Sequence, residues 1–124
     1  MSATDGERPP VCVGHLHIYA RDPKASAVFY EAIGMRSVWV ADDVAIFELR
    51  GGTHLVVLPT AEPQAGPAEF DLMVDDLAAT HAEWAAQGLT VSEIVTSDIH
   101  QSFTVTDPDH HEITVNNTHV VGPV

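Results

Sequence analysis

Apolar and polar positions alternate over short stretches of this chain and recur at helical spacing in two others. Residues 11–20 alternate and are rich in β-forming side chains, which predicts a strand. Asp22 and Pro23 then supply a helix N-cap and a proline at the first helical position, and Gly34 supplies a stop. Between them, apolar side chains recur at helical spacing: Ala25, Val28, Phe29, Ala32 and Ile33. The pattern predicts a helix from Asp22 to Gly34.

Three short β-rich stretches follow this helix. They are residues 36–41, 44–50 and 53–58. An Asp-Asp pair and a Gly-Gly pair separate them, and both pairs are typical of tight turns. The first half of the chain therefore predicts one strand, one helix and three strands, a βαβββ unit.

The same order of elements begins again after a segment with two prolines and a glycine. Residues 70–74 predict a strand, Asp76 caps a helix that runs through residue 87, and Gly88 ends it. Three more strands are expected, over residues 90–95, 102–106 and 112–116.

An internal repeat accounts for this recurrence. A shift of about 54 residues places Asp22 on Asp76. The same shift places Gly34 on Gly88, so the two helices start and stop on equivalent residues. The sequence therefore predicts an α+β fold in which two βαβββ modules form curved mixed sheets around a cavity.

The chain length allows one domain. The 124 residues, 45% of them hydrophobic, suffice for one core and are too few for two ordinary domains. We expect a flexible N-terminal tail over residues 1–10, a single domain over residues 11–118 and a C-terminal tail over residues 119–124. Within the domain, module one covers residues 11–60, a linker covers 61–68 and module two covers 69–118.

Composition limits the compartment and the partners. No stretch approaches the ~18 consecutive apolar residues of a membrane helix, and the first ten residues lack a secretory pattern. The single cysteine, Cys12, fits a reducing compartment, so we expect a cytoplasmic protein. With 18 acidic and 5 basic residues, the net charge of −13 excludes nucleic acid and anionic membranes as expected partners and favours a cationic or metal-bearing ligand.

Short motifs in both units carry a family resemblance. They are residues 15–22, Phe29-Tyr30, Gly34-Met35, residues 70–76, Gly88-Leu89 and residues 107–112. On these motifs the chain resembles the vicinal oxygen chelate superfamily, which includes glyoxalase I, bleomycin-resistance proteins, fosfomycin-resistance enzymes and extradiol dioxygenases. The resemblance implies the glyoxalase/bleomycin-resistance/dioxygenase fold, with a concave cavity that is commonly completed in a homodimer.

The resemblance also implies four metal points, one on each of four equivalent strands. In this sequence they fall on His15, Val56, Glu69 and Thr114. Val56 cannot bind a metal, Thr114 stands where the family has glutamate, and Glu69 stands where it has histidine. The set is degenerate, and His15 and Glu69 remain as candidate ligands for a divalent metal such as Zn, Ni, Fe or Mn.

Side chains that share a strand face with these points are expected to line the same cavity. His100 is added because it precedes a predicted strand and would alternate with two polar residues. It is interpreted either as a cavity acid-base group or as a solvent-facing histidine. The expected cavity residues are His15, His17, Tyr19, His54, Glu69, Asp71, His100, Glu112 and Thr114.

The remaining histidines have simpler interpretations. His81 lies between apolar positions of the second helix and is expected to pack. His110, His111 and His119 lie in a turn or a tail and are expected to be exposed. His15 and Glu69 are related by the repeat, so we expect them to meet in one cavity near the pseudo-twofold axis.

Three functional hypotheses follow. The first is a homodimer that binds a small organic ligand, such as a cationic or metal-chelating antibiotic, without chemistry. The second is a divalent-metal-dependent lyase, isomerase or dioxygenase with an altered ligand set, including a metal site displaced onto the cavity histidines. The third is a metal-free enzyme that uses His100 or His17 as general base.

Overall fold

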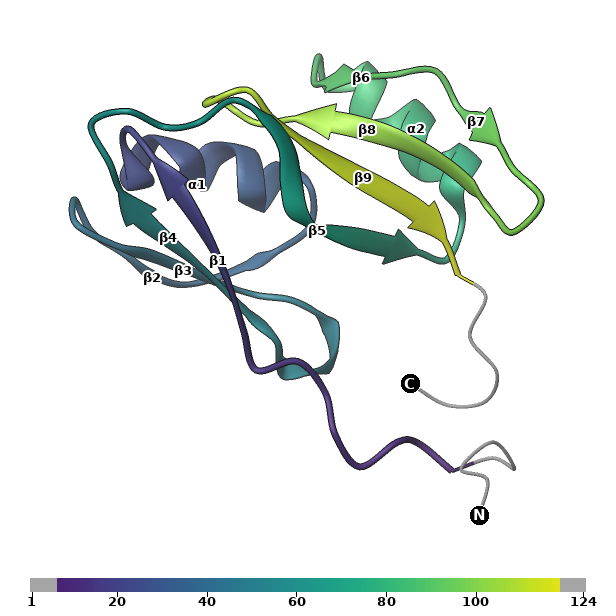
Figure 1. Cartoon of the computed structure of the whole chain (residues 1–124), viewed down its shortest axis with the longest axis horizontal. Helices are drawn as coiled ribbons and strands as arrows, with labels where there is room; N and C mark the ends of the chain where they lie inside the picture. Colours follow the sequence, from purple (N-terminus) through teal and green to yellow (C-terminus); the bar gives the residue numbers. More distant parts are fainter. Residues whose placement is uncertain (1–6, 119–124) are drawn as a thin grey trace.

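The structure, a computed structural model, describes residues 7–118, and Figure 1 shows two successive units in which a strand and a helix are followed by further strands. The first unit contains β1 (His15–Ala20), α1 (Pro23–Ala32), β2 (Arg36–Val40), β3 (Ala45–Glu48), the short 3-10 turn η1 (Arg50–Gly52) and β4 (His54–Pro59). The second unit contains β5 (Gly66–Val74), α2 (Leu77–Ala86), β6 (Thr90–Val91), β7 (Val95–Thr96), β8 (Gln101–Thr106) and β9 (His111–Asn117). The C-terminal tail and His119 lie outside the described residues.

Each unit forms its own mixed sheet. The first has the strand order β1-β4-β3-β2, and the second has β5-β9-β8-β6 with β7 also paired to β8. In both, the first strand of the unit pairs in parallel with the last, and the other pairs are antiparallel. The predicted α+β class and the βαβββ repeat are therefore confirmed.

Local chemistry sets the ends of both helices. The Asp22 carboxylate accepts a hydrogen bond from the Ala25 amide at 3.3 Å, and that of Asp76 accepts one from the Ala79 amide at 3.0 Å. Gly34, shortly after α1, has a φ of +102°, a conformation that strains any residue with a Cβ. No helix among residues 7–118 is long and apolar enough to cross a membrane.

The buried face of α1 differs from the expected one. Val28 is 77% exposed, whereas the neighbouring Phe29 is 6% exposed and Tyr30 is fully buried. The apolar residues of α1 allow two overlapping apolar faces. The face that contains both aromatic rings packs inward because it removes the most apolar surface from water. Val28 and Ala25 therefore lie on the solvent side of the helix.

Two strands have different lengths from those predicted because their partners set their ends. The first strand begins at His15, which pairs with the first residue of β4, so residues 11–14 precede the paired region, although the Gly14 carbonyl still accepts from the His54 amide at 2.9 Å. β5 begins at Gly66, inside the segment expected as linker, because Gly66 and Pro67 pair with the start of β9.

The single strand expected over residues 90–95 is two short strands, β6 and β7. Between them, the amide and hydroxyl of Ser92 bond to the carbonyl and amide of Thr104 at 2.9 and 2.8 Å. The serine side chain thus takes a position that a backbone carbonyl would hold in a regular ladder, and the edge strand is interrupted there.

One hydrophobic core runs through both units. α1 packs on one face of the first sheet and α2 on one face of the second (Figure 1). The largest fully buried aromatic side chains are Tyr30, Phe47 and Phe103. The opposite face of each sheet is open, and the residues of interest lie on those open faces.

Candidate functional site

The open face of the first sheet carries three imidazoles. His15, His17 and Tyr19 alternate with inward side chains along β1, and His54 stands opposite His15 on β4. The ring centroids of His15 and His54 are 5.9 Å apart, and those of His15 and His17 are 6.5 Å apart. An oxygen of Glu48 lies 3.6 Å from Nε2 of His54, so a carboxylate joins this group.

The open face of the second sheet is acidic and rich in hydroxyls. Glu69 and Asp71 lie on the exposed side of β5, and Glu112 and Thr114 lie on the same side of β9. Asp71 is opposite Thr114, and its carboxylate accepts a hydrogen bond from the Asn116 side chain at 3.2 Å.

A cavity of about 750 Å³ joins the two repeats beside β1 and the start of β5, which lie side by side in Figure 1. His17 and Tyr19 line it from β1, and Glu69 lines it from β5. His15 is not among its lining residues, and no described hydrogen bond or ion pair links His15 to Glu69. The structure thus brings His17, rather than His15, into one cavity with Glu69.

The other expected cavity residues do not line this cavity. His54 remains beside His15 and Glu48 on the first sheet. His100 lies in the turn between β7 and β8, where its carbonyl accepts a hydrogen bond from the Ser97 hydroxyl at 2.8 Å. Three further residues lie on the open side of the second sheet and are not among the lining residues: Asp71, Glu112 and Thr114.

Sequence analysis named His17, Tyr19 and Glu69 among the lining residues and missed the others, including Glu62 and His111. His111 was expected to be exposed, and this is wrong, because it is only 7% exposed and lines the cavity. The available signal was the alternation along β9, in which Ile113 and Val115 are fully buried. Continued by two residues towards the N-terminus, that alternation places the His111 side chain on the buried face of β9.

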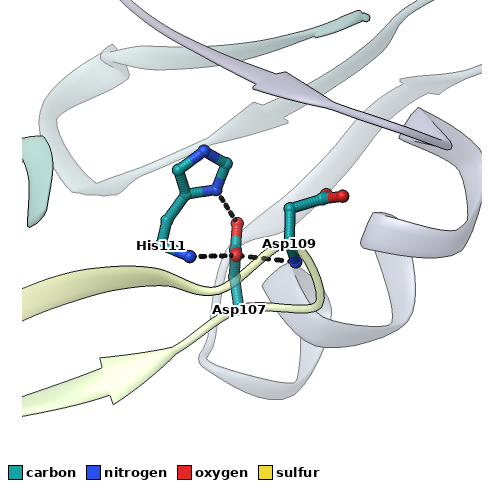
Figure 2. A group of neighbouring side chains, drawn as sticks. All are labelled: Asp107, Asp109 and His111. Carbon is teal, nitrogen blue, oxygen red and sulfur yellow. Dashed lines mark hydrogen bonds and ion pairs between the residues drawn. The ribbon is translucent and has the colours of Figure 1, made fainter. Parts of the chain in front are cut away.

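Asp107 holds His111 in place, as Figure 2 shows. One carboxylate oxygen of Asp107 accepts hydrogen bonds from the amides of Asp109 and His111 at 2.9 and 2.8 Å. The other oxygen accepts from the Tyr30 hydroxyl and lies within hydrogen-bond distance of Nδ1 of His111, both at 2.7 Å. The network fixes the turn before β9 and links it to α1 of the first unit.

Tyr30 is a permanent donor in this network. Burial raises the pKa of the Tyr30 hydroxyl far above its usual value, and the negative charge of Asp107 raises it further. The hydroxyl therefore keeps its proton at neutral pH, and Asp107 keeps a donor from the other unit.

Within residues 7–118, one group of acidic and histidine side chains has ligand atoms that all lie within 4.8 Å of one another: Asp107, Asp109 and His111. An ionised carboxylate has about four lone-pair sites, and the four contacts to Asp107 occupy them. A cation at Asp107 would have to displace the Tyr30 hydroxyl, the His111 ring or a turn amide. We therefore interpret this group as the anchor of the turn.

The comparison with known families settles the relationship of the chain. The family model described as a glyoxalase-like domain matches residues 15–116. The chain belongs to the glyoxalase-like domain family. This confirms the resemblance to the vicinal oxygen chelate superfamily, and the match spans both repeats, from the start of β1 to the end of β9.

Solved structures share the fold of this glyoxalase-like protein. A lactoylglutathione lyase from Agrobacterium tumefaciens superposes with a TM-score of 0.72 at 19% identity over 88% of this chain and 95% of its own. The bleomycin resistance determinant encoded on transposon Tn5 gives 0.70 at 18% identity over 89% and 100%. The oxidase ChaP-H1 gives 0.64 at 19% identity over 87% and 96%. No curated protein matches the sequence. Since these relatives carry different names, the likeness establishes the fold and leaves the activity open.

The four metal points of the superfamily do not form a metal site in this glyoxalase-like protein. Val56 lies on the open face between His17 and Ile46 and offers no ligand atom. Thr114 lies between Asp71 and Thr104 and offers one neutral hydroxyl. A divalent metal needs three or four converging nitrogen or carboxylate oxygen ligands, so the residues present do not fit that ion.

Proposed function

We propose that this glyoxalase-like protein binds a small organic ligand in the cavity between β1 and β5, without a metal at the four superfamily points. The observation that carries the proposal is that one cavity is lined from both repeats, by His17 and Tyr19 from the first and by Glu69 and His111 from the second. Its volume, about 750 Å³, lies in the range of small-molecule sites. The replacement of two metal points by Val56 and Thr114 supports binding over metal chemistry.

The proposal includes a cytoplasmic location and no nucleic-acid or membrane partner. The single cysteine, Cys12, is an exposed thiol, which suits a reducing compartment. The net charge of −13 disfavours contact with phosphate-rich surfaces.

We also propose a homodimer that covers the open face of the first sheet. Large apolar side chains lie on that face with more than half of their surface exposed: Tyr19 at 53% and Trp39 at 59%, the latter opposite Ile46. An apolar sheet face left in water is typical of an interaction surface. Light scattering at micromolar concentration is expected to give twice the 13.3 kDa chain mass. Trp39→Glu should shift the mass to that of the monomer, and Val28→Glu on the far side of α1 should not. A monomeric mass for the unaltered chain would contradict the dimer.

Metal content tests the binding proposal directly. Protein purified without added metal or chelator is expected to contain well under one equivalent of any divalent ion per chain, because two of the four superfamily points lack a strong ligand. Elemental analysis by inductively coupled plasma mass spectrometry gives this ratio. A stoichiometric ion that resists dialysis would contradict the proposal.

A second candidate function is a divalent-metal-dependent lyase, isomerase or dioxygenase with an altered ligand set. The observation that favours it is the group on the first sheet, where His15 faces His54 and a Glu48 oxygen lies 3.6 Å from the His54 ring. Imidazole and carboxylate ligands suit Zn, Ni, Fe and Mn. A stoichiometric metal that is lost in His54→Ala and retained in His81→Ala would favour this function over binding alone.

A further inference from the structure

We infer that the ligand of this cavity carries a cationic group with N–H donors, such as an amine, amidine or guanidine, and that one of these donors binds Nε2 of His111. The inference rests on the proposed function, because it takes the cavity as the ligand site. It adds the ligand class and assigns recognition to a residue that the superfamily resemblance does not single out.

The first step is the tautomer of His111. The carboxylate of Asp107 accepts hydrogen bonds from two amides and from the Tyr30 hydroxyl, and its fourth contact is Nδ1 of His111 at 2.7 Å. An ionised carboxylate accepts hydrogen bonds and donates none, so Nδ1 must carry the proton. In a neutral imidazole with a protonated Nδ1, Nε2 is an acceptor.

The second step is that Nε2 is the atom that His111 offers to the cavity. The His111 amide donates to Asp107, its carbonyl accepts from the Asp107 amide at 3.0 Å, and Nδ1 is bound to the Asp107 side chain. Figure 2 shows the second ring nitrogen on the edge of the ring that faces away from Asp107. Among the described contacts none involves Nε2, and His111 is one of the residues that line the cavity. In its neutral form, His111 therefore presents a hydrogen-bond acceptor there.

The third step is the charge of the cavity. Two carboxylates line it, those of Glu62 and Glu69, and no lysine or arginine does. The Arg21 guanidinium donates to the Ala61 carbonyl at 3.0 Å, and Arg21 is not part of the lining. A cavity with an acceptor imidazole and two carboxylates favours a donor-bearing cation over an anion of the same shape.

The fourth step is the apolar part of the ligand. Ile18 and Leu58 line the same cavity, and the Tyr19 ring lies at its wall. An aromatic face beside carboxylates attracts a cation as well as an apolar body. The matching ligand is therefore a small organic cation with an apolar or planar portion.

Benzamidinium and benzoate form a matched pair of probes, because they have nearly the same shape and opposite charge, and benzyl alcohol serves as the neutral probe. The intact, ¹⁵N-labelled chain is titrated with each while amide chemical shifts are recorded. Benzamidinium is expected to shift the amides of His17, Glu69 and His111 saturably, and benzoate is not. His111→Phe is expected to weaken benzamidinium binding about tenfold or more, which equals the loss of one strong hydrogen bond to a charged group. His110→Asn, an exposed neighbour, should leave binding unchanged.

A second measurement keeps the inference testable if His111→Phe fails to fold. A long-range ¹H–¹⁵N correlation on the unaltered chain at neutral pH is expected to show the proton of the His111 ring on Nδ1. Glu69→Gln, an exposed change, is expected to weaken benzamidinium binding several-fold through lost charge.

The outcomes distinguish an error in the ligand class from an error in the proposed ligand site. Benzoate or benzyl alcohol shifting the cavity amides while benzamidinium does not would overturn the ligand class and leave the cavity as a ligand site. An Nε2–H tautomer, a ring protonated on both nitrogens at neutral pH, or full benzamidinium binding in a folded His111→Phe protein would overturn the role of His111. If none of the three probes shifts a cavity amide, both the inference and the proposed ligand site are wrong.

Discussion

Replacing Asp107 by alanine is expected to lower the free energy of unfolding by about 3–5 kcal/mol, as for removal of one partner from a buried charged network. The Asp107 carboxylate is the acceptor for the Tyr30 hydroxyl, the His111 ring and two turn amides. Alanine would leave these donors without a partner in an environment where Asp107 is 4% exposed and Tyr30 is fully buried. The loss exceeds that of one hydrogen bond because several donors are affected together.

Urea unfolding measures this change in the free energy of unfolding, and two further variants serve as comparisons. Asp75→Ala removes the same charge from an exposed ion pair with Arg50 and should cost under about 1 kcal/mol. Tyr30→Phe removes one donor and keeps the rest, so it should cost about 1–3 kcal/mol. If Asp107→Ala were as mild as the Asp75 control, the network would not stabilise the fold.

Phe29→Ala is expected to cost about 3–5 kcal/mol, as for other large-to-small changes in a core. Phe29 is 6% exposed and packs edge-on against the Tyr30 ring, with centroids 5.0 Å apart. Truncation removes this contact and leaves a void between α1 and the first sheet that the surrounding strands can fill only in part.

The neighbouring Val28 provides the control for this variant. It is 77% exposed, so Val28→Ala should change the free energy of unfolding by no more than about 0.5 kcal/mol. Unfolding curves in denaturant, compared at equal slope, give both values. A loss under about 1 kcal/mol for Phe29→Ala would mean that the ring is not part of the core.

The helices could be predicted from the sequence because their ends depend on neighbouring residues alone. Asp22 and Asp76 cap helices through amides three residues later, and Gly34 and Gly88 follow the helix ends with positive φ angles. Each of these signals lies within one turn of the boundary that it sets.

Strand ends were less predictable because they depend on distant partners. His15 begins a strand since His54 is available opposite it, and Gly66 does so because His111 is. The break at Ser92 depends on a side chain that bonds to the backbone of Thr104. None of these pairings can be recognised from the local pattern of apolar residues.

In the candidate site too, features set by neighbouring residues were predictable and features set by distant residues were not. The alternation along β1 predicted that His17 and Tyr19 share a face, and the structure places both beside one cavity. The role of His111 depends on Asp107 and on Tyr30, which lies 77 residues from that carboxylate in the sequence. Such a contact is determined by the packing of the two units against each other, which the repeat alone does not specify.

The hydrogen bond between Tyr30 and Asp107 also bears on the ancestry of the two halves. A shift of about 54 residues puts Trp84 at the place of Tyr30. The turns before β4 and β9 match with a shift of about 58 residues, because the amides of Leu49 and Asp107 each donate to the carbonyl four residues later, so Leu49 stands at the place of Asp107. A leucine side chain has no hydrogen-bond acceptor, so the reciprocal bond from the second helix to the first unit cannot form. Two identical copies of a half-length ancestor would make this contact twice or not at all. Because the contact is made only once, the two modules must have diverged after the duplication. Their order in the chain can therefore no longer be exchanged without losing this contact.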